Sequence, residues 1–245
     1  MDELIRRRCA GKKVAILGFG REGESTYHLL HRVLEGQLLT ILDARDEVRD
    51  HPLLKGEPAI RIVTGPDYLS GLDSFDVIFR SPGIVIWPLM ESDIHQPPGE
   101  LTAGKFTSQT AFFLEKYHHQ VIGVTGTKGK STTASLISHI LKTAGRDVIL
   151  AGNIGTPLFN VIQLITPETM VVADLSSHQL ELPGMAPHIG VFLNLFQEHL
   201  DAYPSYEAYQ KAKLNIARFR REDDILVING RSEERRVGKE CRSRW

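Results

Sequence analysis

The sequence predicts an α/β protein made of two consecutive parallel-sheet units. Two apolar runs of strand length, KVAILG (13–18) and QVIGVTG (120–126), each lead into glycine-rich turns. Further apolar runs follow each turn and alternate with segments of helical periodicity. This alternation is typical of parallel sheets covered by helices.

The first unit is expected to span residues 1–106. A helix is predicted at 24–36, where apolar residues recur at helical spacing and Gly36 can end it. A second strand is predicted at LLTILD (38–43), and further strands or strand ends are predicted at RIVTG (61–65) and DVIFRSPG (76–83). The segment 107–117 should form a helix that leads out of this domain.

The second unit is expected to span residues 107–230 and to be incomplete. A helix is predicted at 131–144, with Leu136, Ile137, Ile140 and Leu141 on one face. DVILAG, MVVADLSS and IGVFLNL should be strands, and a helix should follow at 203–219, with Pro204 near its start. DDILVING (223–230) is predicted as one more strand.

Composition limits the function classes. The chain has 245 residues, 42% of them hydrophobic, and a net charge of −1, which gives no reason to expect nucleic acid or a membrane as partner. No apolar run approaches the roughly 20 residues that span a bilayer, and the charged N-terminus has no signal-peptide core. With only two cysteines, a cytoplasmic protein is expected, and we expect a monomer.

The last fifteen residues, RSEERRVGKECRSRW (231–245), are basic and have no apolar period. They are similar to the translation of a sequencing adapter, so we expect a non-native tail and leave it out of the fold prediction. A natural basic tail is the alternative.

The stretch TGTKGKST (125–132) predicts a phosphate-binding loop of the P-loop ATPase type. Glycines let backbone N–H groups point at a phosphate, and the following helix adds its positive end. Lys130 would reach the β- and γ-phosphates, and the Ser131 hydroxyl would hold Mg²⁺. A glycine turn with incidental lysines is the alternative.

GFGREG (18–23) matches the dinucleotide-binding pattern of a Rossmann-like domain, and Asp43 follows Gly23 by 20 residues. Three interpretations stay open. In the first, the glycines only allow close packing. In the second, they bind a dinucleotide. In the third, the helix N-terminus takes another diphosphate whose base or sugar Asp43 contacts. The third fits best beside a second nucleotide site.

Four segments in order carry a family resemblance: TGTKGKSTT (125–133), GNIG (152–155), DLSSHQLE (174–181) and EHLDAYPSYEAYQKAKLNI (198–216). Together they resemble the Mur ligases, over essentially all of residues 10–230. The N-terminal GFGREG and SPG (81–83) are most similar to members that add D-glutamate.

The resemblance implies ATP- and Mg²⁺-dependent amide formation in peptidoglycan precursor synthesis. ATP would phosphorylate the carboxylate of UDP-N-acetylmuramoyl-L-alanine, and the amine of D-glutamate would attack the acyl phosphate, giving ADP and phosphate. Positioning and charge stabilisation would dominate catalysis. The family's C-terminal amino-acid-binding domain has no counterpart here, so we expect no turnover from this polypeptide alone.

The resemblance also implies residue roles. The catalytic set is Lys130, His199 and Lys213, and the metal set is Ser131, Asp174, His199 and Lys213. The ATP loop is Gly126, Thr127, Lys128, Gly129, Lys130, Ser131 and Thr132. The precursor would contact Gly18, Gly20, Gly23, Asp43, Ser81, Gly83, Asn153 and Gln179. Asp174 and Glu198 replace the usual Glu and Asp, and Lys128 a more usual Asn.

Lys213 shares a helical stripe with Tyr206, Tyr209 and Ile216, so it should face inward. By itself such a lysine usually extends its head to solvent. In the family this position is a lysine carbamylated by CO₂ that helps hold a second Mg²⁺. Among other histidines, we expect His178 to pack and His118 and His119 to be solvated.

Three alternatives remain. Another Mur-type ligase would add a different amino acid. A nicotinamide-dependent oxidoreductase would bind NAD(P) and would not need Lys130. A non-catalytic module would bind nucleotide or UDP-sugar without turnover.

Overall fold

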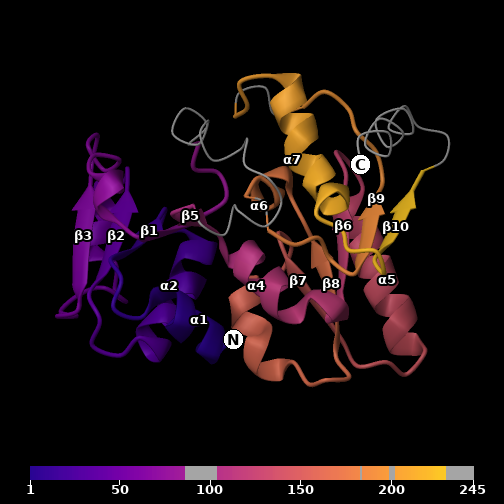
Figure 1. Ribbon diagram of the computed structural model, residues 1–245, viewed down its shortest axis with the longest axis horizontal. Helices are drawn as coiled ribbons and strands as arrows, with labels where there is room; N and C mark the ends of the chain where they lie inside the picture. The colour runs from indigo at the N-terminus through magenta and orange to yellow at the C-terminus, as the bar shows by residue number, and fades with distance from the viewer. Residues whose placement is uncertain (86–103, 183, 199–201, 230–245) are drawn as a thin grey trace.

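A computed structural model describes residues 1–85, 104–182, 184–198 and 202–229 and confirms the α/β class. Within these ranges the chain forms two five-stranded parallel sheets that share no strand, seen side by side in Figure 1. The first has the order β3-β2-β1-β4-β5 and the second the order β10-β9-β6-β8-β7.

The first sheet is built from short, mostly buried strands. They are β1 (Val14–Leu17), β2 (Leu39–Asp43), β3 (Ile60–Thr64), β4 (Val77–Arg80) and β5 (Phe106–Thr107). The helices are α1 (Asp2–Cys9) and α2 (Arg21–Val33), with 3₁₀ turns η1 (Asp46–Asp50) and η2 (Leu72–Ser74). Every residue of β1 and β2 is buried, as expected for a parallel sheet covered on both faces.

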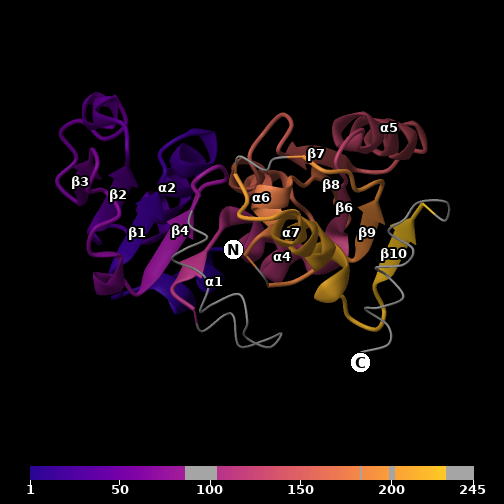
Figure 2. The same ribbon diagram turned by 90° about the horizontal axis from the view of Figure 1, so that it is seen from above.

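The second sheet contains β6 (Val121–Thr125), β7 (Val148–Gly152), β8 (Met170–Asp174), β9 (Ile189–Phe192) and β10 (Ile225–Ile228). Its helices are α4 (Gln109–Tyr117), α5 (Lys130–Thr143), α6 (Ser177–Leu180) and α7 (Tyr206–Arg218), with η4 (His118–Gln120) and η5 (Leu158–Leu164). Figure 2 shows α5 and α7 on opposite sides of this sheet.

Each sheet reverses its strand order beside its first strand. In the first sheet the chain runs from β1 outward through β2 and β3, then returns to β4 on the other side of β1. In the second it runs through β7 and β8, then crosses to β9 on the other side of β6. Open parallel sheets bind ligands at the carboxyl ends of the strands beside such a reversal.

Three sequence expectations need correction. Helix α2 begins at Arg21, three residues early, because Gly20 stands in an extended N-cap conformation. On α5, Leu136 and Ile140 are each 56% exposed, since the face toward the sheet is formed by Ala134, Ile137, Ser138 and Leu141. His118 is buried rather than solvated.

The limits of the two domains stay a prediction: β5 includes Thr107, one residue past the expected division. Residues 231–245 lie outside the described residues. Among those that are described, no helix has the length and hydropathy needed to cross a membrane.

Polar contacts join the two sheet units around helix α2 and strand β4. Ser25 Oγ donates to Asn160 Oδ1 at 2.5 Å, and the Arg21 guanidinium donates to the carbonyl of Gly155. Arg80 at the end of β4 forms a buried ion pair with Glu181 beyond α6. These contacts place the carboxyl end of β1 beside the loop that follows β7.

Candidate functional site

The phosphate-loop motif forms the expected strand, loop and helix. Gly129, with φ of 83°, directly precedes α5, and Gly126 has φ of 155°. A Cβ on Gly126 would lie 3.0 Å from the Leu193 Cβ, so the close approach of two chain segments also favours glycine there. The α5 N-terminus therefore opens onto a loop whose backbone can come close to a phosphate.

Asn194, which follows β9, braces this loop. The backbone N–H groups of Thr127 and Lys128 donate to Asn194 O and Oδ1, each at 2.9 Å, and Asn194 Nδ2 donates to Lys128 O at 3.0 Å. The Thr127 hydroxyl is 3.0 Å from the Tyr209 hydroxyl on α7. Sequence reasoning placed 189–195 in a strand and missed Asn194, because only the fold brings it to the loop.

Asp174 lies at the end of β8, directly beside the loop. Its side chain is fully buried, and Ser131 Oγ donates to its Oδ2 at 2.9 Å. Its Oδ1 is buried and makes no hydrogen bond to any residue that the structure describes. A buried carboxylate oxygen without a partner is costly, and a hard cation between it and the Ser131 hydroxyl would satisfy it. The residues present therefore fit Mg²⁺.

Two lysines complete this cluster. Lys130 Nζ donates to Thr127 O at 3.0 Å, and Lys213 Nζ donates to Gly126 O at 2.7 Å. Lys213 is only 1% exposed, as the stripe on α7 predicted, and its Nζ lies 5.0 Å from the centre of the Tyr209 ring. Burial, followed by the nearby charge of Lys130, lowers the pKa of Lys213 to about 7.

A glycine joins this cluster to a neighbouring cleft at the carboxyl ends of β1, β2 and β4. A Cβ on Gly152, at the end of β7, would lie 2.4 Å from Asp174 O, so β7 and β8 can meet there only with glycine. The next residue, Asn153, donates its backbone N–H to that same carbonyl at 2.8 Å. Asn153 is thereby held at the wall of the cleft.

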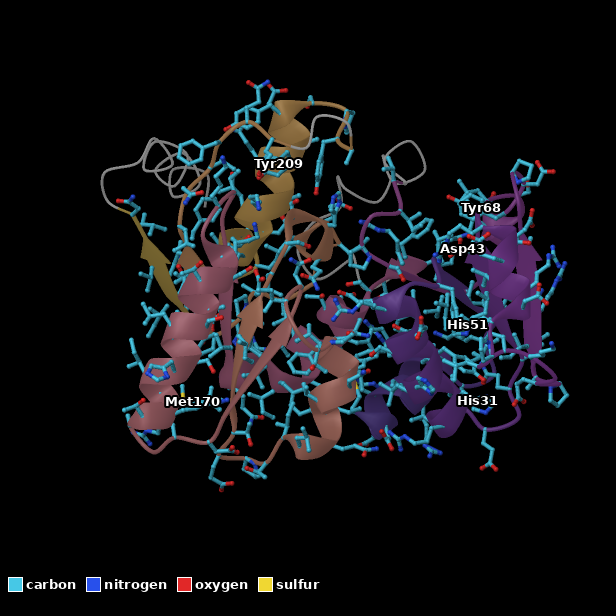
Figure 3. All side chains as sticks on the ribbon, turned by 180° about the vertical axis from the view of Figure 1, so that it is seen from behind. His31, Asp43, His51, Tyr68, Met170 and Tyr209 are labelled. Carbon is cyan, nitrogen blue, oxygen red and sulfur yellow. The ribbon has the colours of Figure 1, made fainter. Side chains whose placement is uncertain are left out.

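A cleft of about 530 Å³ lies at the carboxyl ends of β1, β2 and β4. The predicted contact residues Gly18, Gly20, Asp43, Ser81, Gly83 and Asn153 all line it. Its size is in the range of small-ligand sites. Figure 3 shows Asp43 toward the same upper side of the molecule as Tyr209, whereas Met170, at the start of β8, lies on the lower side.

Both carboxylate oxygens of Asp43 accept hydrogen bonds from neighbouring residues. Its Oδ2 accepts the backbone N–H of Phe19 at 2.7 Å, and its Oδ1 accepts the backbone N–H and Nε of Arg45 at 2.9 and 3.0 Å. Burial by itself would raise the pKa of Asp43, but these hydrogen bonds outweigh it and lower the pKa. Asp43 therefore holds Arg45 at the cleft, a residue that the motif search missed.

Two predicted contact residues do not line the cleft. A Cβ on Gly23 would lie 2.2 Å from Gly18 O, so Gly23 allows α2 to pack on the end of β1. Gln179 is buried, and its Nε2 donates to Glu22 Oε1 at 2.5 Å. Glu22 does line the cleft, and burial raises its pKa to about 7 although Gln179 and Arg80 oppose the shift.

The remaining predicted residues are placed as follows. Thr132 is exposed on the first turn of α5, and Lys128 is exposed on the loop. His199, predicted to ligate a metal, lies outside the described residues, between Glu198 and Ala202. His178 packs as expected, stacked on Tyr203 with ring centres 5.2 Å apart.

Fold and site together define an α/β protein with a phosphate-loop motif and an adjoining cleft. Residues 124–244 match the family model of the Mur ligase middle domain. The chain is 36% identical over 229 residues to the UDP-N-acetylmuramoylalanine--D-glutamate ligase of Acetivibrio thermocellus, covering 92% of this chain and 47% of the relative. The Clostridium botulinum (strain Loch Maree) protein of that name is 35% identical, with 89% and 46% covered.

These matches place the chain in the Mur ligase family. It spans about half the length of the relatives it matches. Among solved structures, the UDP-N-acetylmuramate:L-alanyl-gamma-D-glutamyl-meso-diaminopimelate ligase of Neisseria meningitides is 21% identical with a TM-score of 0.48, covering 94% of this chain and 75% of that one.

The burial of Lys213 predicts a pH-dependent effect of Lys213→Met. Between pH 7 and about 10 the unfolded chain holds a proton on Lys213 that the folded chain has lost, so this residue makes stability rise with pH. The variant lacks that rise. We therefore compare the two free energies of unfolding in urea titrations. The value for Lys213→Met minus the value for wild type should decrease from pH 7 to pH 9.

Lys142→Met, on the exposed end of α5, is the matched control and should show a difference from wild type that is independent of pH. A pH-independent difference for Lys213→Met as well would contradict the lowered pKa.

Proposed function

We propose that these residues supply the ATP site and the UDP-precursor site of a ligase that joins D-glutamate to UDP-N-acetylmuramoyl-L-alanine. ATP would phosphorylate the precursor's terminal carboxylate, the D-glutamate amine would attack the acyl carbon, and phosphate would leave. The relatives' shared name supports this choice of substrates. Such a protein would work in the cytoplasm, where ATP and the precursor are made available.

The observation that carries the proposal is the double role of Asp174. Its side chain contacts Ser131 of the phosphate loop, and its backbone carbonyl holds Asn153 at the cleft wall. One residue therefore couples the proposed nucleotide site to the proposed precursor site. A reaction that moves a phosphoryl group from one ligand to the other needs the two sites adjacent in this way.

On the ATP side, each residue has a defined task. The backbone N–H groups of 129–132 at the α5 N-terminus would cradle the phosphates, while those of Thr127 and Lys128 are held by Asn194. Lys130, which now bonds to its own loop at Thr127 O, would turn to the β- and γ-phosphates. Ser131 and Asp174, with His199, would hold Mg²⁺, which supplies positive charge against the phosphate oxygens.

On the precursor side, the cleft offers an anion site at the start of α2. Gly20 precedes α2 at the cleft wall and has no side chain to cover the helix N-terminus, and Arg45 adds a cation. A dinucleotide cofactor would require a free acidic group for the ribose hydroxyl. Both oxygens of Asp43 are already bonded to Phe19 and Arg45, which disfavours that interpretation. The same bonds leave Asp43 no oxygen for a uridine either, so the UDP-sugar proposal rests on the diphosphate at the α2 N-terminus and on the relatives' name.

The first test measures ATP affinity by calorimetry with and without Mg²⁺. Asp174→Asn should weaken Mg²⁺-dependent ATP binding by about tenfold or more, since a charged ligand is lost, and should leave Mg²⁺-free binding nearly unchanged. Glu168→Gln, an exposed acid of the same domain, should behave as wild type. Equal Mg²⁺ dependence in Asp174→Asn and wild type would contradict the metal role.

The second test separates the alternative functions. The wild-type chain should bind UDP-N-acetylmuramoyl-L-alanine and not NAD⁺ or NADP⁺, whereas an oxidoreductase would bind the latter. Protein of the relatives' full length should release ADP from ATP with precursor and D-glutamate, and not with other amino acids. A different amino acid would indicate another Mur-type ligase, and binding without turnover would indicate a non-catalytic module.

Lys213 is proposed to be carbamylated and to ligate a second cation with His199. A neutral amine is the form that attacks CO₂, and a pKa of about 7 supplies it at physiological pH. Protein incubated with ¹³C-bicarbonate should show a carbamate resonance by NMR, stronger at pH 8 than at pH 6. The resonance should vanish in Lys213→Ala and persist in Lys142→Ala. Its absence from wild type would contradict this role.

A further inference from the structure

Three histidines and a buried aspartate gather at the amino-terminal edge of the second sheet, on the side opposite the phosphate loop. His118 and His119 belong to η4, which leads into β6, while His188 directly precedes β9 and Asp224 directly precedes β10. Because β6, β9 and β10 are neighbouring parallel strands, their starts lie next to one another. Backbone hydrogen bonds from His188 N to His118 O and from Ile225 N to His188 O fix them there.

The donor atoms of these residues converge. A ring nitrogen of each of His118, His119 and His188 lies within 4.8 Å of those of the other two. The ring centres of His118 and His119 are 4.7 Å apart, and those of His119 and His188 are 5.6 Å apart. Asp224 Oδ1 lies 2.8 Å from His118 Nε2 and 3.0 Å from His188 Nδ1. Histidine nitrogens with a carboxylate oxygen form the donor set that Zn²⁺ prefers.

The protonation of His118 makes this cluster unusual. Its Nδ1 lies 2.7 Å from the carbonyl oxygen of Ala186, which can only accept, so Nδ1 carries the hydrogen. In the neutral ring Nε2 then has a lone pair. Nε2 is buried and makes no hydrogen bond to any described residue, although Asp224 Oδ1 is 2.8 Å away. Two acceptor atoms that close repel each other unless a cation lies between them.

The second carboxylate oxygen of Asp224 has a hydrogen-bond partner outside the histidine cluster. Asp224 Oδ2 accepts the backbone N–H of Arg221 at 2.7 Å, which orients the carboxylate and leaves Oδ1 toward the histidines. The Nδ1 hydrogen bond of His118 to Ala186 O is the kind of outer contact that orients histidine ligands of metals. The Arg221 guanidinium lies 3.4 Å from His119 Nε2, but this contact is exposed and the long side chain can turn away.

We propose that His118, His119 and His188, with Asp224, bind a transition-metal dication of the Zn²⁺ type that ties together the starts of β6, β9 and β10. The competing arrangement is a proton on His118 Nε2 that pairs with Asp224. A proton explains one contact, between His118 and Asp224. A hydrogen on His188 Nδ1 would likewise explain its 3.0 Å contact with Asp224 Oδ1, but neither proton explains why His119 turns a nitrogen toward the same point.

The test is Zn²⁺ binding to the untagged full chain after chelator treatment, measured by calorimetry in excess Mg²⁺. Mg²⁺ occupies oxygen-rich sites such as that at Asp174 and competes poorly for imidazole. Wild type should bind a single Zn²⁺, and Co²⁺ bound in its place should give the visible absorption of a four-coordinate ion. Saturating Zn²⁺ should also raise the Tm of the wild-type chain by several degrees.

Buried His118 is left intact because its replacement could prevent folding. His119→Ala and His188→Ala, at exposed and half-exposed positions, should each weaken Zn²⁺ binding at least tenfold and abolish the Tm increase. His139→Ala removes an exposed histidine from α5 of the same domain and should bind Zn²⁺ as wild type does. Absence of Zn²⁺ binding in wild type, or binding unchanged in His119→Ala and His188→Ala, would overturn the proposal and favour the protonated pair.

Discussion

The close meeting of β7 and β8 at their carboxyl ends is the constraint on which the candidate site depends. A Cβ at position 152 would lie 2.4 Å from the carbonyl oxygen of Asp174, so the position needs glycine. Because the two strands can therefore approach, Asn153 reaches that carbonyl and the Asp174 side chain stays turned toward Ser131. A wider separation of these strand ends would detach the cleft from the phosphate loop.

The phosphate loop, Lys213 and Asp174 carry charged groups that the free protein does not pair with one another and that a bound ligand would pair. Lys130 and Lys213 both bond to carbonyl oxygens of the loop, and the charge of Lys130 disfavours that of Lys213. Asp174 leaves one buried oxygen without a hydrogen bond. Unpaired buried charge lowers stability, and active sites commonly retain it because preorganised charge stabilises reacting groups.

Most of the fold could be predicted from local sequence, and part of the site could not. Apolar runs and glycine turns located the strands because buried parallel strands need continuous apolar residues. The stripe on α7 correctly placed Lys213 inside. The exposed Leu136 and Ile140, and the bracing Asn194, were missed because they depend on which face of α5 meets the sheet and on how β9 ends. Those are tertiary facts, without a local signal.

The two edges of the second sheet differ in the chemistry they present, and the reason is topological. At the carboxyl edge, a helix N-terminus and glycines collect backbone N–H groups, which suit phosphate and a hard cation. At the amino edge, among the residues that the structure describes, the side chains that directly precede β6, β9 and β10 supply the donors. There His118 and His188 flank Asp224, a softer donor set than serine with carboxylate. The residues of β6 separate the two edges, and the two proposed sites would select different cations because their donor sets differ.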